Sequence, residues 1–66
     1  MIELIGKNAG TVWTVLNEKG QLSVKELKKA TKIRTDKELF AAVGWLAKEG
    51  KLSFSEKEAE IFIALV

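Results

Sequence analysis

The stretch that decides the fold is Thr35-Asp-Lys-Glu-Leu-Phe-Ala-Ala-Val-Gly-Trp-Leu-Ala-Lys-Glu-Gly-Lys-Leu-Ser-Phe54. Its first part predicts a helix, because apolar residues recur at spacings of four, three and one. This spacing places them on one side of a 3.6-residue repeat. The apolar stripe consists of Leu39, Val43, Leu46 and Ala47.

Both ends of this helix have local signals. Thr35 can cap its start, and Glu38 stands three residues later, as a capping box requires. Gly50 follows the last periodic residue and supplies the left-handed conformation that closes a helix. Leu52 and Phe54 then alternate with serines, which predicts a strand directly after the glycine.

Upstream of Thr35 the pattern predicts two more helices. Residues 3–18 carry one helical stripe, and Gly20 closes that helix. A very short strand is expected at Gln21-Leu22. Ser23 and Glu26 form a second capping-box pattern, which opens a helix over residues 24–31. The first stripe is Ile5, Ala9, Val12, Trp13 and Leu16, and it places Trp13 in the core.

The second helix turns Val24, Leu27 and Ala30 inward, and Ile33 is expected to fill the turn after it. After Phe54 the sequence predicts a hairpin. One strand covers residues 52–55, residues 56–59 form a polar tip, and residues 60–65 return. Three helices followed by a hairpin predict an α+β, mainly helical fold, a winged helix-turn-helix that occupies residues 1–66 as one domain.

Composition argues against catalysis. The 66 residues contain no Cys and no His, so the commonest general base and the usual metal ligands are missing. No Gly-rich phosphate loop or paired-carboxylate motif is visible. The sequence therefore predicts a binding module with no cofactor and no metal. The chain start lacks a signal-peptide pattern, and no apolar run approaches the roughly 20 residues of a membrane span, so a cytoplasmic protein without membrane contact is expected.

Three segments resemble the small bacterial and archaeal winged-helix family of unknown function DUF2582. They are Ile5-Gly-Lys-Asn-Ala-Gly-Thr-Val-Trp-Thr-Val-Leu16, Leu27-Lys-Lys-Ala30 and Ala42-Val-Gly-Trp-Leu-Ala-Lys-Glu49. The resemblance covers nearly the whole chain, and Gly44-Trp45-Leu46 is its most specific part. It implies the winged-helix fold and implies no activity.

Charge is distributed unevenly along the chain. Residues 25–37 hold six basic residues against two acidic ones, a net charge of +4. A helix-turn-helix places its phosphate contacts in this region, so these bases are candidate DNA ligands, although a merely solvated helix face is an equally good interpretation. The candidates are Lys25, Lys28, Lys29, Lys32, Arg34 and Lys37.

The outer face of the helix after Thr35 favours a different partner. Lys37, Ala41, Gly44 and Lys48 occupy it, and groove-reading helices usually present Arg, Asn, Gln, Ser or Thr instead. A strip of small residues between two aromatics suits a homodimer or another protein contact. Trp45 could equally fold back as core. The candidate interface is Phe40, Ala41, Gly44, Trp45 and Phe62.

The hairpin adds evidence against a wing that follows DNA. The hairpin end contains one basic residue, Lys57, against three acidic ones, Glu56, Glu58 and Glu60. Carboxylates repel phosphates. Two functions stay open at this point: a DNA-binding module of the regulator type, favoured slightly because most winged helices bind nucleic acid, and a protein-interaction or homodimerisation module.

Overall fold

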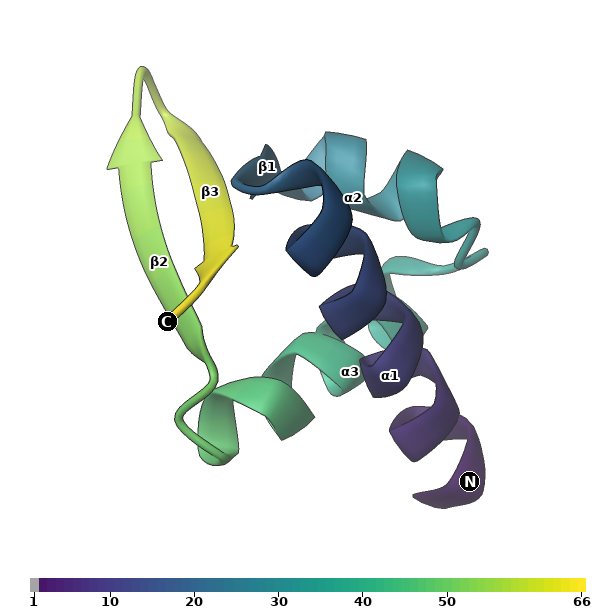
Figure 1. The fold of residues 1–66 in the computed structure, drawn as a ribbon. Helices are drawn as coiled ribbons and strands as arrows, with labels where there is room; N and C mark the ends of the chain where they lie inside the picture. Colours follow the sequence, from purple (N-terminus) through teal and green to yellow (C-terminus); the bar gives the residue numbers. More distant parts are fainter. Residues whose placement is uncertain (1) are drawn as a thin grey trace.

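The computed structural model describes residues 2–66 and consists of three helices and a three-stranded antiparallel sheet (Figure 1). This architecture confirms the winged helix-turn-helix predicted from the sequence. Its elements, in chain order, are α1 (Ile2–Lys19), β1 (Leu22–Ser23), α2 (Val24–Thr31), α3 (Asp36–Lys48), β2 (Leu52–Lys57) and β3 (Glu60–Leu65).

The helix ends follow from local hydrogen bonds. Ser23 Oγ accepts from the Glu26 N–H at 3.2 Å, and Glu26 Oε1 accepts from the Ser23 N–H at 3.0 Å, so both halves of the predicted capping box are formed. Thr35 Oγ1 caps α3 by accepting from the Glu38 N–H at 3.1 Å. Gly50 follows α3 with a φ of 71°, the left-handed conformation predicted for it.

The core lies where α1, α3 and the sheet meet. α1 packs mainly against α3, and Ile63 of β3 is 1% exposed beneath them. The core contains Ala9, Val12, Leu16, Leu27, Ile33, Leu39, Ala42, Val43, Leu46, Leu52 and Ile63. Ile33 therefore fills the turn after α2, as predicted.

The prediction that Trp13 lies in the core is wrong, because its side chain is 41% exposed. Val12 is fully buried, and the next residue of a helix points about 100° further round its axis. Trp13 therefore lies at the edge of the buried stripe and not within it. Ala42, which the predicted stripe of α3 omitted, is fully buried instead.

The sheet has the order β1-β3-β2, so the last strand of the chain lies in its middle. Leu22 of β1 and Phe54 of β2 both stand opposite Ile63 of β3. β1 is thus part of the sheet that carries the wing, and it joins the start of α2 to the hairpin (Figure 1).

The hairpin turn is tighter than predicted. β2 continues to Lys57, which leaves a two-residue turn, Glu58 and Ala59, in place of a four-residue tip. Both turn residues have positive φ, at 50° and 65°. Two-residue hairpin turns of the primed type need this geometry because it matches the twist of the strands. In the part of the chain from Ile2 onward, no helix is both long and apolar enough to cross a bilayer.

Candidate functional site

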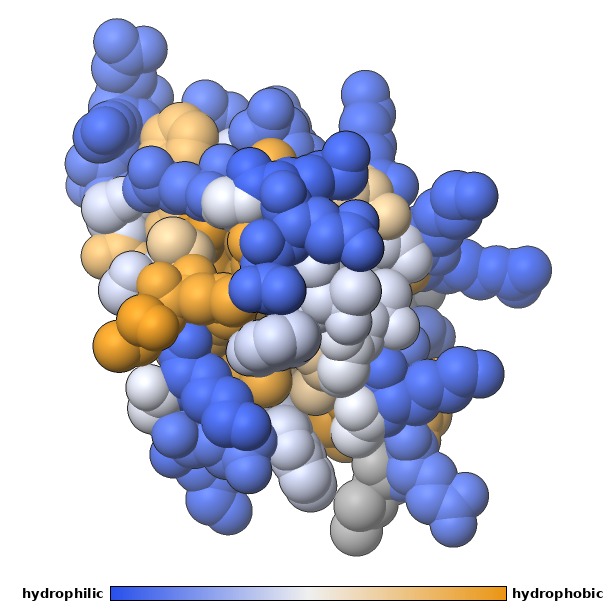
Figure 2. Space-filling model, in the orientation of Figure 1, coloured by the Kyte–Doolittle hydropathy of each residue, from blue (hydrophilic) through white to orange (hydrophobic). Residues whose placement is uncertain are grey.

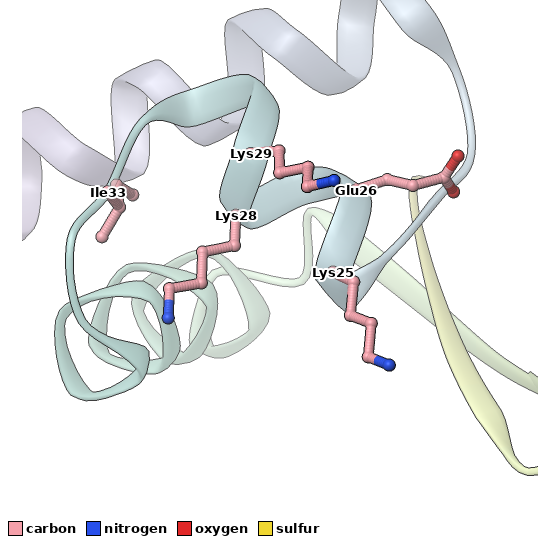
Figure 3. A pocket seen from close by; sticks show the side chains of 5 residues that line it. All are labelled: Lys25, Glu26, Lys28, Lys29 and Ile33. Carbon is pink, nitrogen blue, oxygen red and sulfur yellow. The ribbon is translucent and has the colours of Figure 1, made fainter.

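The N-terminal end of α2 positions the first group of basic side chains. The Ser23 capping box begins the helix, and Leu27 points into the core with no exposed surface. Lys25 and Lys29 are therefore directed outward and exposed, and Lys28 is half-buried. Figure 3 shows the three amines extending away from the axis of α2.

These lysines surround a shallow hollow of about 460 Å³ on the surface of α2, which we call the α2 hollow. Ile33, almost fully buried, lies at its side in the turn that follows the helix (Figure 3). The hollow therefore combines apolar surface with positive charge, because lysine stems are apolar and only their tips carry charge. It is lined by Lys25, Glu26, Lys28, Lys29 and Ile33.

Lys28 differs from its neighbours because it forms an ion pair. Its Nζ lies 2.8 Å from Asp36 Oδ1, at the first residue of α3. In Figure 3 its side chain points from α2 toward the helix below it. The pair joins the two helices of the helix-turn-helix and leaves Lys28 with less free charge than Lys25 or Lys29.

The remaining candidate bases continue this charge toward α3. Lys32 has a left-handed φ of 59° at the end of α2, and Arg34 and Lys37 are exposed in the turn and in the first turn of α3. Within residues 2–66 only Lys28 of this set lies in an ion pair. We call the six residues the basic surface: Lys25, Lys28, Lys29, Lys32, Arg34 and Lys37.

Glu26 is the one acid that lines the α2 hollow. The hydrogen bond donated by the Ser23 backbone, together with the bond to the Ser23 side chain, holds the pKa of the Glu26 carboxyl below its ordinary value. The ionised carboxylate of Glu26 is therefore held in the capping box, where its negative charge stabilises the N-terminal end of α2.

The outer face of α3 is partly as predicted. Phe40 is 52% exposed, and Gly44 one turn later is open, since a Cβ added there would meet no atom within 4 Å. Ala41 is half-buried beside Leu4 and Asn8 of α1. Phe40 and Gly44 therefore form the exposed part of this face, and Ala41 belongs to the contact with α1.

Trp45 lies at the opposite edge of α3 from Phe40. It is 40% exposed and lines a hollow with Gly10 and Trp13 of α1. Trp45 thus lies beside α1 but is not buried. This position is closer to the folded-back interpretation than to a fully outward side chain. Both tryptophans therefore line the same hollow between α1 and α3.

Phe62 is separated from the other candidate interface residues. It stands opposite Ser55, and its neighbour Ile63 points to the core. Because side chains alternate along a strand, Phe62 lies on the outer face of the sheet, away from α3. The structure therefore brings Phe40 and Gly44 together and places Phe62 on another side of the molecule.

Sequence reasoning missed an apolar area on the wing. Phe54 is 52% exposed and Ile61 is 48% exposed, although both share the core face of the sheet with Ile63. The helices cover only the base of the hairpin, so its apolar alternation continues past the core. Figure 2 shows hydrophobic surface on the side where Figure 1 places the sheet. The apolar alternation of the hairpin, from Leu52 to Leu65, is longer than the helices can cover, and its length could have indicated these exposed side chains.

No group of three or more His, Cys, Asp or Glu residues is arranged to hold a metal ion in the described part of the chain. The site is thus made of a basic surface on α2 and the turn, an aromatic and glycine face on α3, and an apolar, acidic wing.

A family model described as a winged helix-turn-helix domain, DUF2582, matches residues 1–65. The chain belongs to the DUF2582 family. This confirms the resemblance found in the sequence. The DUF2582 chain is also similar to a solution NMR structure of protein BT2368 from Bacteroides thetaiotaomicron, with 36% identity and a TM-score of 0.84. The match covers 96% of this chain and 76% of that one. No curated protein matches this DUF2582 chain.

Proposed function

We propose that this DUF2582 domain is a non-enzymatic DNA-binding module of the regulator type. It would grip the phosphate backbone with α2, the following turn and the first turn of α3. The observation that supports this is the basic surface, in which five of six cations have no ion-pair partner within residues 2–66. These elements are the ones that a helix-turn-helix lays against the duplex. A cytoplasmic location accords with this function.

The contact would be to phosphates and not to bases. The exposed face of α3 offers Phe40 and Gly44 beside two lysines, Lys37 and Lys48, and only the lysines can donate a hydrogen bond. The acidic wing tip would stay away from the duplex, because its carboxylates repel phosphate. We therefore expect binding that depends steeply on salt and weakly on sequence.

Fluorescence anisotropy with two duplexes of unrelated sequence, over a salt series, tests this proposal. Lys25→Ala/Lys29→Ala should weaken both complexes equally and reduce the salt slope by about 0.9 for each lost phosphate contact. Lys7→Ala/Lys19→Ala is the matched control, since it removes the same charge from exposed positions of α1. Absence of binding at low salt, or equal losses in the two double variants, would overturn the proposal.

A second candidate function is a protein-interaction module on the outer face of α3. The supporting observation is Gly44, which lies in the helix interior with open space around it. Glycine costs a helix interior about 1 kcal/mol relative to alanine, and no close contact among the described residues requires it. Beside the exposed ring of Phe40, it would let a second copy approach closely, which gives a homodimer.

Sedimentation of Gly44→Glu tests this second candidate. A bulky charge at the contact should separate the subunits, whereas Gly6→Glu, which adds the same side chain at an exposed position of α1, should leave them associated. A parent protein that sediments as a monomer would exclude the α3 homodimer.

A further inference from the structure

The end of the wing carries an apolar pair next to acidic groups. Phe54 stands opposite Ile63, and Ile61 is two residues before Ile63, so Phe54 and Ile61 are diagonal neighbours on one face of the hairpin. Glu56, opposite Ile61, shares that face and lines a shallow hollow with both. We call Phe54, Glu56, Glu58 and Ile61 the wing patch.

The charge of the wing patch is unsatisfied within its own chain. The hairpin end holds Glu56, Lys57, Glu58 and Glu60, a net charge of −2. None of its carboxylates lies within 4 Å of a basic group in the described residues, where the ion pairs are Lys28–Asp36 and Glu49–Lys51. Two half-exposed apolar side chains beside unpaired carboxylates suit a contact with a surface that offers both apolar and basic groups.

The α2 hollow has the complementary properties. Its charged lining is Lys25, Glu26, Lys28 and Lys29, a net charge of +2. Its apolar surface comes from Ile33 and the lysine stems. The wing patch and the α2 hollow are therefore opposite in charge, and each combines apolar surface with charged groups, as complementary interfaces do.

We propose that two copies of this chain associate reciprocally, with the wing patch of each copy seated on the α2 hollow of the other. Phe54 would lie among the stems of Lys25 and Lys29, where an aromatic ring also attracts the ammonium groups. Glu56 and Glu58 would pair with these amines. Because each copy offers both surfaces, a two-fold arrangement makes the contact twice and closes the assembly at two subunits.

The same contact would regulate the DNA binding proposed above, a consequence that rests on that proposed function. Lys25 and Lys29 belong to both the α2 hollow and the basic surface, so a seated wing would cover phosphate ligands. Assembly and DNA binding would then exclude each other, and DNA would shift the chain toward the monomer.

A charge-swap experiment tests the reciprocal contact. The wing variant is Glu56→Lys/Glu58→Lys, and the α2 variant is Lys25→Glu/Lys29→Glu. Each alone places like charges across both contacts, so its dimer should weaken at least tenfold in sedimentation equilibrium at low ionic strength. Mixed in equal amounts, the two variants place opposite charges across both contacts, and a mixed dimer should form with near-parental affinity.

Two controls separate this contact from other surfaces. Two double variants, Glu3→Lys/Glu18→Lys and Lys19→Glu/Lys48→Glu, tested alone and mixed, apply the same two reversals at exposed sites outside both surfaces and should leave association unchanged. Gly44→Glu should also leave it unchanged, because α3 takes no part. A parent that stays monomeric at millimolar concentration and low salt, a mixture that fails to re-form the dimer, or a dimer that Gly44→Glu dissociates would each overturn the proposal.

Anisotropy with a duplex keeps the two proposals distinguishable. The wing variant should bind DNA at least as tightly as the parent, and the α2 variant should bind weakly. If the mixed variants re-form a dimer but no variant binds DNA, the assembly is supported and the DNA-binding function is overturned. If the parent binds DNA but does not self-associate, the DNA-binding function is supported and the assembly is overturned.

Discussion

Lys28 Nζ lies 2.8 Å from Asp36 Oδ1, so an ion pair joins the middle of α2 to the first residue of α3. The two side chains are 37% and 70% exposed, so water screens the pair, and pairs of this kind contribute about 0–1 kcal/mol to stability. The main effect of the ion pair is to reduce the free positive charge of the basic surface, because Asp36 offsets the charge of Lys28.

We therefore expect Lys28 to matter less than Lys29 for DNA binding. Lys29→Ala should reduce the salt slope of binding by about 0.9, and Lys28→Ala by clearly less, because Asp36 already competes for its charge. Anisotropy titrations over a salt series measure both slopes. Adding Asp36→Ala should strengthen binding and raise the contribution of Lys28. Equal slopes for the two single lysine variants would show that the ion pair opens on DNA.

Gly44 in α3 and Gly50, which follows the end of α3, should respond in opposite directions to alanine. Gly44 lies inside the helix with open space, so Gly44→Ala should stabilise the chain by about 0.5–1 kcal/mol. Gly50 has a φ of 71°, so Gly50→Ala should destabilise it by about 1–2 kcal/mol. Urea unfolding followed by circular dichroism compares the two. A loss at Gly44 would mean that its small size serves a contact such as the α3 interface.

A substitution in the wing turn should increase the stability of the chain. Ala59 has a φ of 65° in a two-residue turn, a conformation that glycine adopts without strain. We expect Ala59→Gly to stabilise the chain by about 0.5–1 kcal/mol, measured as a rise in the urea midpoint. The control is Ala64→Gly, in the extended strand β3, which should lower that midpoint.

Ile61 and Ile63 occupy the same face of β3 but differ in environment. Ile63 is 1% exposed at the centre of the core, so Ile63→Ala should cost about 2–5 kcal/mol. Ile61 is half-exposed on the wing, so Ile61→Ala should change the stability of the monomer by less than about 1 kcal/mol. Thermal unfolding of dilute protein distinguishes them. Comparable losses would show that the wing tip folds back onto the helices.

The stability of the chain should depend on the charge of Glu26. Folding lowers the pKa of this carboxyl below 4.5, through its bonds to Ser23. A group with a lowered folded pKa stabilises the native state above its ordinary pKa, and this contribution is lost as the pH falls through the folded pKa. Glu26→Gln keeps a hydrogen-bond acceptor and removes the titration. The difference in unfolding free energy between parent and variant should therefore shrink as the pH falls below about 4.5. A constant difference would exclude a titrating capping box.

Local chemistry made much of the fold predictable from the sequence. The Ser23 and Glu26 capping box, the cap at Thr35 and the left-handed glycine at position 50 act over three or four residues, so they can be recognised without any tertiary context. The stripes of α2 and α3 are similarly local, because one helical period decides which side chains meet. The basic surface was found for the same reason, since its residues are close in sequence.

Tertiary structure alone decided which apolar residues are covered and which charges are paired. Trp13 and Phe54 fit the apolar patterns of their elements, yet both are exposed. Trp13 lies at the angular edge of the buried stripe of α1, and Phe54 lies on the wing beyond the length that the helices cover. The contact between Lys28 and Asp36 depends on the angle between two helices, and the separation of Phe62 from Phe40 depends on the pairing of β1 and β2 with β3. Periodicity specifies the face on which a side chain lies, but burial depends on how far the neighbouring element extends, which only the packed chain determines.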